Sequence, residues 1–206
     1  MIGIYGGTFN PVHYGHLRTA LEVNELFDLD DIRLLPCSLP AHRENPSVNA
    51  QMRLQMLQLA VKDYPQLQVD SREIDRAGIS YMVDTLAELR AESPGIPIIL
   101  FMGADAFNGL SGWHQWQALF DYAHIVVMTR PQFIRNKLAD FYSDKLVSSR
   151  ESLNLSVSGK IFFQKVRDLD ISATDIRNAF IENKNPSFLL PESIIEYIRA
   201  HKLYSA

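Results

Sequence analysis

Apolar positions along the chain alternate between short continuous runs and longer stretches with helical spacing. The short runs at 2–5, 32–35, 98–102 and 125–129 predict strands. The run at 98–102 shows no polar alternation, which is typical of a strand that is covered on both faces. Between the runs lie amphipathic stretches, such as the one from His13 to about Phe27. This alternation of strand and helix predicts an α/β protein with a parallel sheet and right-handed crossovers.

Caps and buried stripes predict the remaining elements. We expect helices over 49–62, from 80 onward, over 113–120, from 172 or 174 onward and over 191–199, and strands over 67–70 and 161–164. Asn49 and Ser80 are the expected N-caps of the first two of these helices. Their expected buried faces are Met52, Met56, Leu59 and Ala60 for the first, and Val83, Leu86 and Leu89 for the second. Residues 132–152 show no clear pattern.

Composition restricts the class of protein. The chain has 206 residues, 47% of them hydrophobic and 21% charged, which suits one globular domain spanning 1–206. A net charge of −4 gives no support for binding polymeric nucleic acid. The single cysteine, Cys37, excludes an internal disulfide, fits a reducing cytosol and is expected to be a small buried hydrophobe at a strand end. The first residues read as a core strand, and no apolar run is long enough to span a membrane.

The stretch 4–16, Ile-Tyr-Gly-Gly-Thr-Phe-Asn-Pro-Val-His-Tyr-Gly-His, carries the densest chemistry. Gly6 and Gly7 let the backbone turn and approach a ligand closely. His13 and His16 lie three apart on the first helical turn and therefore share one face. Because helix N-termini present amide donors and a positive dipole end, this arrangement predicts a site for a phosphate chain.

Plainer interpretations of the same features exist. Strand-Gly-Gly-helix units are common, and a histidine at a helix start is often a cap or a surface group. The stretch fits neither the dinucleotide fingerprint nor the triphosphate-binding loop, because neither glycine spacing is present. The combination Gly-Thr-Phe-x-Pro-x-His-x-x-His is more specific, and its His13-Tyr-Gly-His16 resembles the T/HxGH signature of the nucleotidylyltransferase superfamily.

Three further segments hold candidate ligand contacts. Asp105 follows the buried strand at 98–102 and is expected on the ligand rim of the sheet. The proline-rich loop at 36–48 carries His42 and Arg43 just past a strand end, although such a loop is often plain surface. The segment 170–177 offers capping hydroxyl groups and Arg177, and a helix cap with an incidental arginine is the plainer interpretation.

Taken together, the segments 6–16, 103–105, 113–131 and 171–177 resemble the bacterial nicotinate-nucleotide adenylyltransferases, in an order that covers nearly the whole chain. The closing stretch around Tyr197 and Tyr204 is similar too. In the loop at 39–43 the sequence is Leu-Pro-Ala-His-Arg, where many relatives have Lys-Pro-Pro-His-Lys. That departure leaves open which basic side chain of this loop reaches a phosphate.

The resemblance implies a Rossmann-like doubly wound parallel sheet with C-terminal helices. It also implies a reaction in which the phosphate of nicotinate mononucleotide attacks the α-phosphorus of ATP directly, with no covalent enzyme intermediate. The products are nicotinate adenine dinucleotide and pyrophosphate, a step of cytoplasmic NAD biosynthesis. Such transfer depends on alignment and charge stabilisation. Mg²⁺ is expected to arrive bound to the substrate, without a metal site on the protein, and neither a nucleic acid polymer nor a membrane is expected as a partner.

The resemblance also implies the site residues. The catalytic residues are His13, His16 and Arg177. The ATP contacts are Gly6, Gly7, Thr8, Phe9, His13, His16, Gly103, Asp105, Ile171, Ser172, Thr174 and Arg177. The nicotinate mononucleotide contacts are Thr8, Phe9, His42, Arg43, Ser80, Tyr81, Met82 and Trp113.

Other functions stay open at this point. A pantetheine-phosphate adenylyltransferase or a cytidylyltransferase would share the two phosphate motifs but should lack the helix at Trp113. A non-catalytic nucleotide-binding regulator would keep the fold, although the intact His13, His16 and Arg177 argue against it. An interaction protein with incidental motifs is the third possibility. Pyrophosphate release and ATP binding separate these functions.

Overall fold

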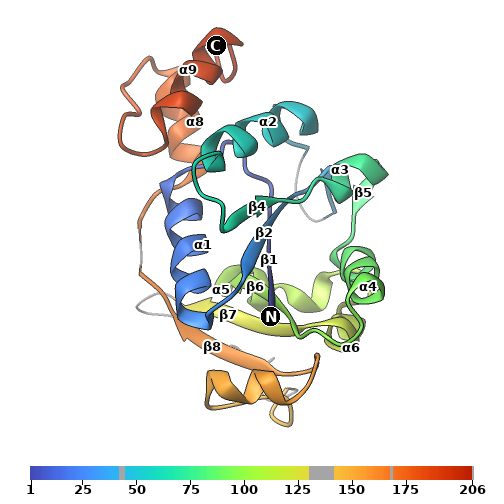
Figure 1. The fold of residues 1–206 in the computed structure, drawn as a ribbon. Coiled ribbons are helices and arrows are strands. Elements are labelled where there is room, and N and C mark those ends of the chain that lie inside the picture. The colour runs from blue at the N-terminus through green and yellow to red at the C-terminus, as the bar shows by residue number, and fades with distance from the viewer. Residues whose placement is uncertain (42–44, 130–141, 168, 206) are drawn as a thin grey trace.

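The computed structural model describes residues 1–41, 45–129, 142–167 and 169–205, and these form a central parallel sheet flanked by helices, together with a small two-stranded sheet (Figure 1). The sheet has six strands in the order β4-β2-β1-β6-β7-β8 within the described chain. Their bounds are β1 Ile2–Gly7, β2 Asp31–Pro36, β4 Leu67–Val69, β6 Ile98–Gly103, β7 His124–Thr129 and β8 Ile161–Lys165. Every neighbouring pair is parallel, so the predicted doubly wound α/β fold is confirmed.

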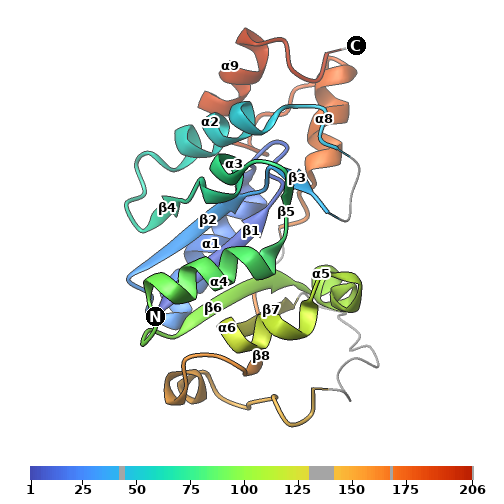
Figure 2. The same cartoon turned by 90° about the vertical axis from the view of Figure 1, so that its right-hand side faces the viewer.

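The helices cover both faces of this sheet (Figure 2). They are α1 Tyr14–Phe27, α2 Ala50–Val61, α3 Arg72–Arg76, α4 Met82–Glu92, α5 Ala104–Asn108, α6 Leu119–Tyr122, α8 Ala173–Ile181 and α9 Glu192–Ala200. The short 3₁₀ turns are Leu110–Gly112, Trp116–Ala118 and Arg150–Leu155. In the described parts of the chain, no helix has the length and apolar character that crossing a membrane requires.

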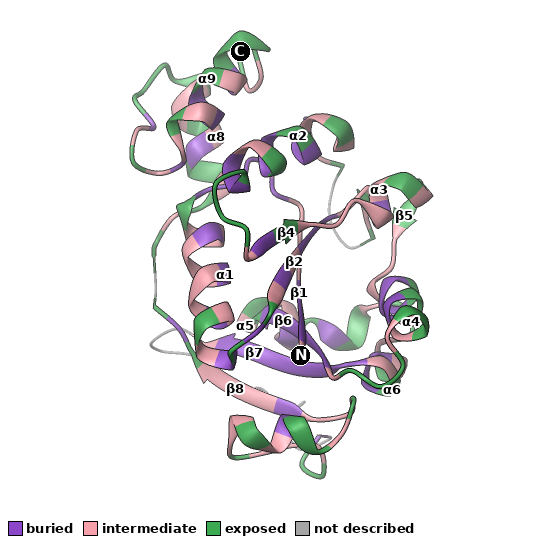
Figure 3. Ribbon diagram, viewed as in Figure 1, coloured by how far each residue is buried: buried purple, intermediate pink, exposed green. Residues whose placement is uncertain are grey.

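Successive residues of the central strands point to opposite faces and enter separate cores. In β6, Ile99 and Phe101 pack in a cluster with α1, α2, α8 and α9. The alternate residues Ile98, Leu100 and Met102 pack with α4, α5 and α6. Burying a strand on both sides requires apolar residues at every position, which explains the unbroken run seen in the sequence. The buried colour of β6 and β7 shows the result (Figure 3).

The strand order reverses beside β1. β2 and β4 extend the sheet to one side of β1, and β6, β7 and β8 extend it to the other. In an open parallel sheet the crevice outside the carboxyl ends of the strands at such a reversal is the usual ligand site. Here those ends are Gly7 in β1 and Gly103 in β6, both of which the sequence places in candidate ligand segments.

Several predicted elements differ in detail. The loop at 36–48 contains a two-residue strand β3, Leu39–Pro40, which pairs in parallel with β5, Ile79–Ser80. The prediction that Ser80 caps a helix was therefore wrong, because Ser80 lies in β5 and Tyr81 is the N-cap of α4. The prediction of one continuous helix over 113–120 was also wrong. Gln115 adopts a left-handed conformation with φ of 47°, which separates two 3₁₀ turns before α6 begins.

The buried face of α2 is rotated from its prediction. Met56 and Ala60 are buried as expected, whereas Met52 and Leu59 are only partly covered. Their places are taken by Leu54, Leu57 and the charged Arg53, which is 1% exposed. The pattern of apolar residues does not predict a buried arginine at this position, because arginine is almost never fully buried. The predicted cap of α2 is confirmed, since the Asn49 side chain accepts a hydrogen bond from the Met52 amide at 2.9 Å.

Candidate active site

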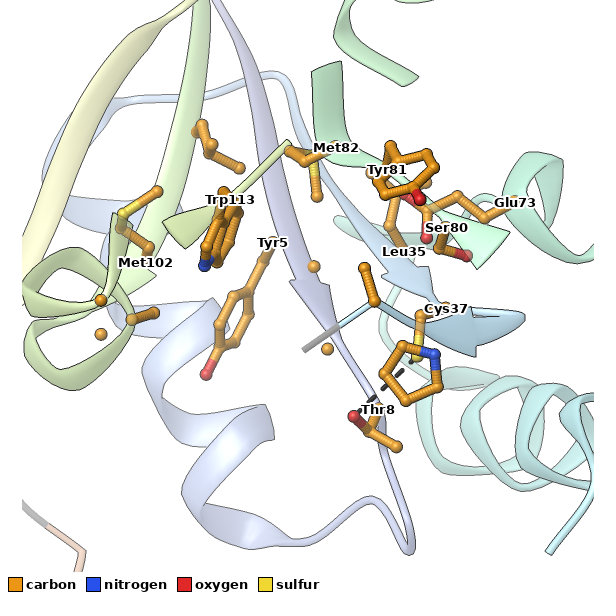
Figure 4. Close-up of a pocket in the computed structure, with 18 of the residues that line it drawn as sticks. Tyr5, Thr8, Leu35, Cys37, Glu73, Ser80, Tyr81, Met82, Met102 and Trp113 are labelled. Atoms are coloured by element: carbon orange, nitrogen blue, oxygen red, sulfur yellow. Dashed lines mark hydrogen bonds between the residues drawn. The ribbon is translucent and has the colours of Figure 1, made fainter. Parts of the chain in front are cut away.

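A cavity of about 520 Å³ opens at the carboxyl ends of the central strands (Figure 4). Its floor is formed by the sheet and the adjoining loops, and these lining residues are Tyr5, Gly6, Gly7, Thr8, Leu35, Cys37, Met102, Gly103 and Asp105. One wall is formed by Ser80, Tyr81, Met82 and Glu73, and another by Trp113 and His114. The size and mixed lining of the cavity suit a small polar molecule with a flat ring.

The N-terminus of α4 forms part of this wall. Tyr81 is its N-cap and makes no side-chain capping bond. The Asp84 and Thr85 amides both donate to the Tyr81 carbonyl, at 3.2 and 3.4 Å. The earlier amides, of Met82 and Val83, are the first-turn donors that an α-helix leaves for an outside acceptor. Together with the positive end of the helix dipole they favour an anion at this wall.

A largely buried carboxylate is part of the same wall. Glu73 is 3% exposed and accepts a hydrogen bond from the Thr85 hydroxyl at 2.8 Å. Ser80 also hydrogen-bonds this carboxylate, and its Oγ accepts the Ser38 amide at 2.8 Å. Burial raises the pKa of Glu73, against the opposing effect of those two hydroxyl groups. The Ser80 hydroxyl is thus committed to holding β5 beside the loop that follows β2.

Aromatic side chains supply the flat surfaces of the cavity. Trp113 is partly exposed and lies near Tyr5, facing the cavity (Figure 4). The Tyr81 ring packs against His114 with 4.4 Å between ring centroids. Indole and phenol rings are suited to stacking on a planar ligand, and an indole face attracts a flat cation by about 0.5–2 kcal/mol.

The two predicted histidines form a stacked pair at the start of α1. Their ring centroids are 3.7 Å apart, and Phe9 contacts the His16 ring edge-on at 5.0 Å. Burial, together with His13, lowers the pKa of His16 well below 6.5, so His16 is neutral at pH 7 in the ligand-free protein. The Tyr14 amide is already taken by the Leu189 carbonyl at 3.0 Å and does not face a ligand. His16 is therefore an imidazole N–H donor more than a source of positive charge.

Arg177 supplies a permanent cation at the same end of the molecule. Its Nη1 donates to the Asn10 carbonyl at 2.8 Å, and its Nη2 donates to the Thr174 hydroxyl at 3.1 Å. The Tyr204 hydroxyl donates to the Asn10 side chain at 2.6 Å. These bonds tie α8 and the C-terminal segment to the loop between β1 and α1, in which the Asn10–Pro11 peptide bond is cis.

The segment before α8 lies against the start of α1. Ser172 caps α8, since its Oγ accepts a hydrogen bond from the Asp175 amide at 3.1 Å. A Cβ built on Gly15 would lie 3.5 Å from the Ile171 carbonyl and 2.9 Å from the His13 ring. The chain thus requires glycine at the third position of the His13-Tyr-Gly-His16 motif, because a side chain there would displace His13.

The predicted site residues fall into two groups. The cavity is lined by Gly6, Gly7, Thr8, Ser80, Tyr81, Met82, Gly103, Asp105 and Trp113. Outside its lining, around the start of α1, lie Phe9, His13, His16, Ile171, Ser172, Thr174 and Arg177. The Phe9 side chain is 1% exposed and packs in the core, so only its backbone is available to a ligand. His42 and Arg43 lie outside the described residues.

Sequence reasoning missed several residues at this site. Tyr5, Cys37, Glu73 and His114 line the cavity. Tyr5 ends the first apolar run, and Glu73 closely follows the strand β4, so strand ends were the available signal for both. Cys37 does follow a strand, as predicted, but it is only partly buried, and burial raises the pKa of its thiol. Within the described ranges, no cluster of three or more His, Cys, Asp or Glu side chains suits a metal ion.

The comparisons with known proteins agree with this geometry. A family model described as cytidylyltransferase-like matches residues 4–179. The chain is 44% identical to the probable nicotinate-nucleotide adenylyltransferase of Methylococcus capsulatus, with 100% of both chains covered. It is 45% identical to the protein of the same name from Pseudomonas putida, with 100% of this chain and 95% of that one covered.

Solved structures bear out the fold. The nicotinic acid mononucleotide adenylyltransferase of Plasmodium falciparum, complexed with NaAD, superposes with a TM-score of 0.74 at 16% identity. That comparison covers 98% of this chain and 96% of the other. At this level of identity it speaks for the fold alone, whereas the bacterial relatives are similar over their whole length. The chain therefore belongs to the nicotinate-nucleotide adenylyltransferase family.

Proposed function

We propose that this enzyme transfers the adenylyl group of ATP to nicotinate mononucleotide. An oxygen of the mononucleotide phosphate attacks the α-phosphorus of ATP, and a new P–O bond forms. The bond from that phosphorus to the oxygen bridging the α- and β-phosphates breaks, so pyrophosphate leaves and nicotinate adenine dinucleotide remains. The observation that carries the proposal is the common cavity of the β1 glycines, the α4 N-terminus and Trp113. In this cavity the glycines let a ligand approach the backbone closely, the helix N-terminus can bind an anion, and the indole ring can stack on a planar group of the same molecule.

The wall around α4 suits the mononucleotide. Trp113 stacks on the pyridinium ring, and the amides after Tyr81, beginning with Met82, donate to the nicotinate carboxylate. Ser80 holds this wall in place through Glu73. A carboxamide has one neutral acceptor oxygen, and its NH₂ group cannot accept a hydrogen bond from the second donor. We therefore expect the acid to be preferred over the amide.

The start of α1 and the start of α8 suit the triphosphate of ATP. The backbone from Gly6 to Phe9 lies between the two substrates. His13 and His16 donate to the phosphates around the reacting centre. Arg177 holds the leaving pyrophosphate with its planar fork, aided by the segment from Ile171 to Thr174.

The remaining contacts concern the ribose, the metal ion and the mononucleotide phosphate. Asp105, just after Gly103, is exposed at the cavity rim and suits the ribose hydroxyl groups of ATP. Mg²⁺ enters bound to ATP and keeps most of its waters. His42 and Arg43 remain the proposed contacts to the mononucleotide phosphate. We place the reaction in the cytoplasm, where a protein with one thiol and no disulfide is stable.

A comparison of acceptors tests the proposal. Pyrophosphate release from MgATP is measured with nicotinate mononucleotide, nicotinamide mononucleotide and phosphopantetheine under identical conditions. We expect kcat/KM to be largest for nicotinate mononucleotide, by about 10² over the amide, because two charge-assisted hydrogen bonds differ. Efficient use of phosphopantetheine in place of nicotinate mononucleotide would replace the proposal. Absence of pyrophosphate with every acceptor would favour a regulator instead.

A further inference from the structure

We propose that Arg53 is a positioning residue that shapes the mononucleotide half of the cavity, an inference that rests on the proposed function. Arg53 lies on α2 and is 1% exposed. It is not part of the cavity lining, and nothing in its sequence context marks it. Its guanidinium group nevertheless ends directly behind the wall that the cavity shares with the loops after β1 and β2.

The guanidinium group is used almost entirely on backbone carbonyls. Nη1 donates to the Thr8 carbonyl at 2.7 Å, and Nη2 donates to the carbonyls of Cys37 and Ser38, both at 2.8 Å. Nε donates to the Val48 carbonyl at 3.2 Å. One rigid, planar group thus fixes the loop after β1, which contains Thr8, relative to the loop after β2, which contains Cys37. These two residues are 29 positions apart in the sequence.

These two loops meet at the cavity. Thr8 and Cys37 both line it, and the Cys37 thiol lies 3.9 Å from the Thr8 hydroxyl (Figure 4). The Cys37 amide donates to the Gly7 carbonyl at 3.0 Å, and the Ser38 amide donates to Ser80 in β5. Through Ser38 and Ser80, Arg53 is connected to the wall at the N-terminus of α4. A shift of the guanidinium group would therefore move the wall that faces the mononucleotide.

Arg53 makes no ion pair within the described residues. Arg72 and Arg76 each form ion pairs with carboxylates, but in the described parts of the chain no carboxylate lies within 4.0 Å of the Arg53 guanidinium group. Arginine stays protonated in proteins, so a full positive charge lies behind the cavity wall. Burying a charge is costly, and here bonds to four backbone carbonyls offset part of that cost. A phosphorylated ligand in the cavity would gain from that charge.

Lysine cannot reproduce this arrangement. Its ammonium group is a single point with three donors, whereas the four carbonyls receive bonds from three separate nitrogens of a planar fork. Arg53→Lys thus keeps the charge but cannot hold all four carbonyls. Two of them, Cys37 and Ser38, lie in the loop after β2, on the mononucleotide side of the cavity, and we expect the paired bonds from Nη2 to this loop to be the ones lost. If the role of Arg53 is positioning, this variant raises KM for the mononucleotide more than KM for ATP.

Arg90 provides a matched control. It donates to the carbonyls of Tyr122, Ser93, Ile96 and Val157, beside the start of β6 and away from the cavity. Arg90→Lys therefore disrupts a similar number of backbone bonds without touching either loop. Both variants are purified as full chains, and Tm, kcat and both KM values are measured with saturating co-substrate.

We expect Arg53→Lys to raise KM for nicotinate mononucleotide about tenfold or more, while KM for ATP changes by less than about twofold. Arg90→Lys should lower Tm and leave both KM values unchanged. Equal increases in both KM values for Arg53→Lys, or a Tm loss without any KM change, would overturn the proposal. If Arg53→Lys does not fold, Arg53→Gln, which keeps a planar donor, is measured at 10 °C. The same comparison applies, namely the increase in KM for nicotinate mononucleotide relative to the increase in KM for ATP.

Failure of the proposed function is visible separately. If the wild-type protein uses another acceptor, the increase in KM for that acceptor is compared with the increase in KM for ATP, and the test of Arg53 stands. If the wild type releases no pyrophosphate with any acceptor, titration calorimetry with nicotinate mononucleotide and with MgATP replaces the KM values. An equal loss of affinity for both ligands in Arg53→Lys would then contradict the positioning role.

Discussion

Replacement of His16 by alanine tests the proposed phosphate site most directly. His16 is partly buried, and its ring stacks on His13 with 3.7 Å between centroids. Its Nδ1 atom is buried and has no hydrogen-bond partner within the described residues. A buried polar atom without a partner costs about 1–3 kcal/mol. Because Nδ1 is closed to solvent, the nitrogen that we propose to reach a phosphate oxygen is the other one, Nε2. The alanine variant removes that donor and the cost of the buried Nδ1 together.

The magnitude follows from the kind of interaction lost. Removing one preorganised donor that acts on charge growing in the transition state lowers kcat by about 10²–10³. The stability change should be small, roughly 0–2 kcal/mol, because lost packing against Phe9 and His13 is partly offset by removal of the unsatisfied nitrogen. His16→Asn keeps a donor of similar reach and should retain more activity than His16→Ala. Activity and stability are therefore expected to separate.

The assay is steady-state pyrophosphate release at pH 7.5, accompanied by thermal unfolding of the same samples. His201→Ala is the control, because His201 is exposed and packs against Tyr197 on α9, outside the cavity lining and the α1 start. A folded His16→Ala protein with a kcat near that of the control would refute the reasoning. So would a His16→Asn variant as inactive as His16→Ala, since a donor would then not be the property that matters.

Three further predictions follow from the geometry. Arg177→Lys should raise KM for ATP about tenfold with little change for the mononucleotide, because lysine lacks the planar fork that we propose for the pyrophosphate oxygens. Equal changes for both substrates would indicate that Arg177 acts mainly through its structural bond to the Asn10 carbonyl. Trp113→Ala should lower kcat/KM for nicotinate mononucleotide by the equivalent of about 0.5–2 kcal/mol, and unchanged kinetics would exclude stacking. Burial lowers the pKa of His124 in the folded protein. Below pH 6.5 the unfolded chain therefore binds a proton that the folded protein does not, and the free energy of unfolding decreases as the pH is lowered, by at most about 1.4 kcal/mol per pH unit. His124→Gln should flatten the urea-unfolding profile between pH 5 and 6.5, and an unchanged slope would contradict this.

Local patterns were enough to predict the sheet and the start of the site. The runs at 2–5, 98–102 and 125–129 became β1, β6 and β7 because strands buried on both faces require apolar residues throughout. The His13-Tyr-Gly-His16 motif was predictable because its four residues act within one helical turn. The Asn49 cap and the Ser172 cap are confirmed for the same reason, since each bonds an amide three residues away.

Contacts between distant segments were not predictable from those patterns. Ser80 has the chemistry of an N-cap, but pairing of β5 with β3 places it in a strand and commits its hydroxyl group to Glu73 and Ser38. Arg53 interrupts an apolar helix face, and only the fold shows that four carbonyls meet at its guanidinium group. In both cases a polar residue is explained by neighbours that the sequence does not place beside it.

The position of Asn10 explains why the C-terminal helices belong to the proposed site. Its carbonyl accepts a bond from Arg177, 167 residues away, and its side chain accepts one from Tyr204, 194 residues away. Burial raises the pKa of Tyr204 well above its ordinary value, so this hydroxyl stays protonated and remains a donor at any working pH. The loop that carries the glycines and leads to His13 is thereby fixed by the far end of the chain. Adenylyl transfer depends strongly on the orientation of the reacting groups. Here Arg177 and Tyr204 help to orient the loop after β1 through their bonds to Asn10.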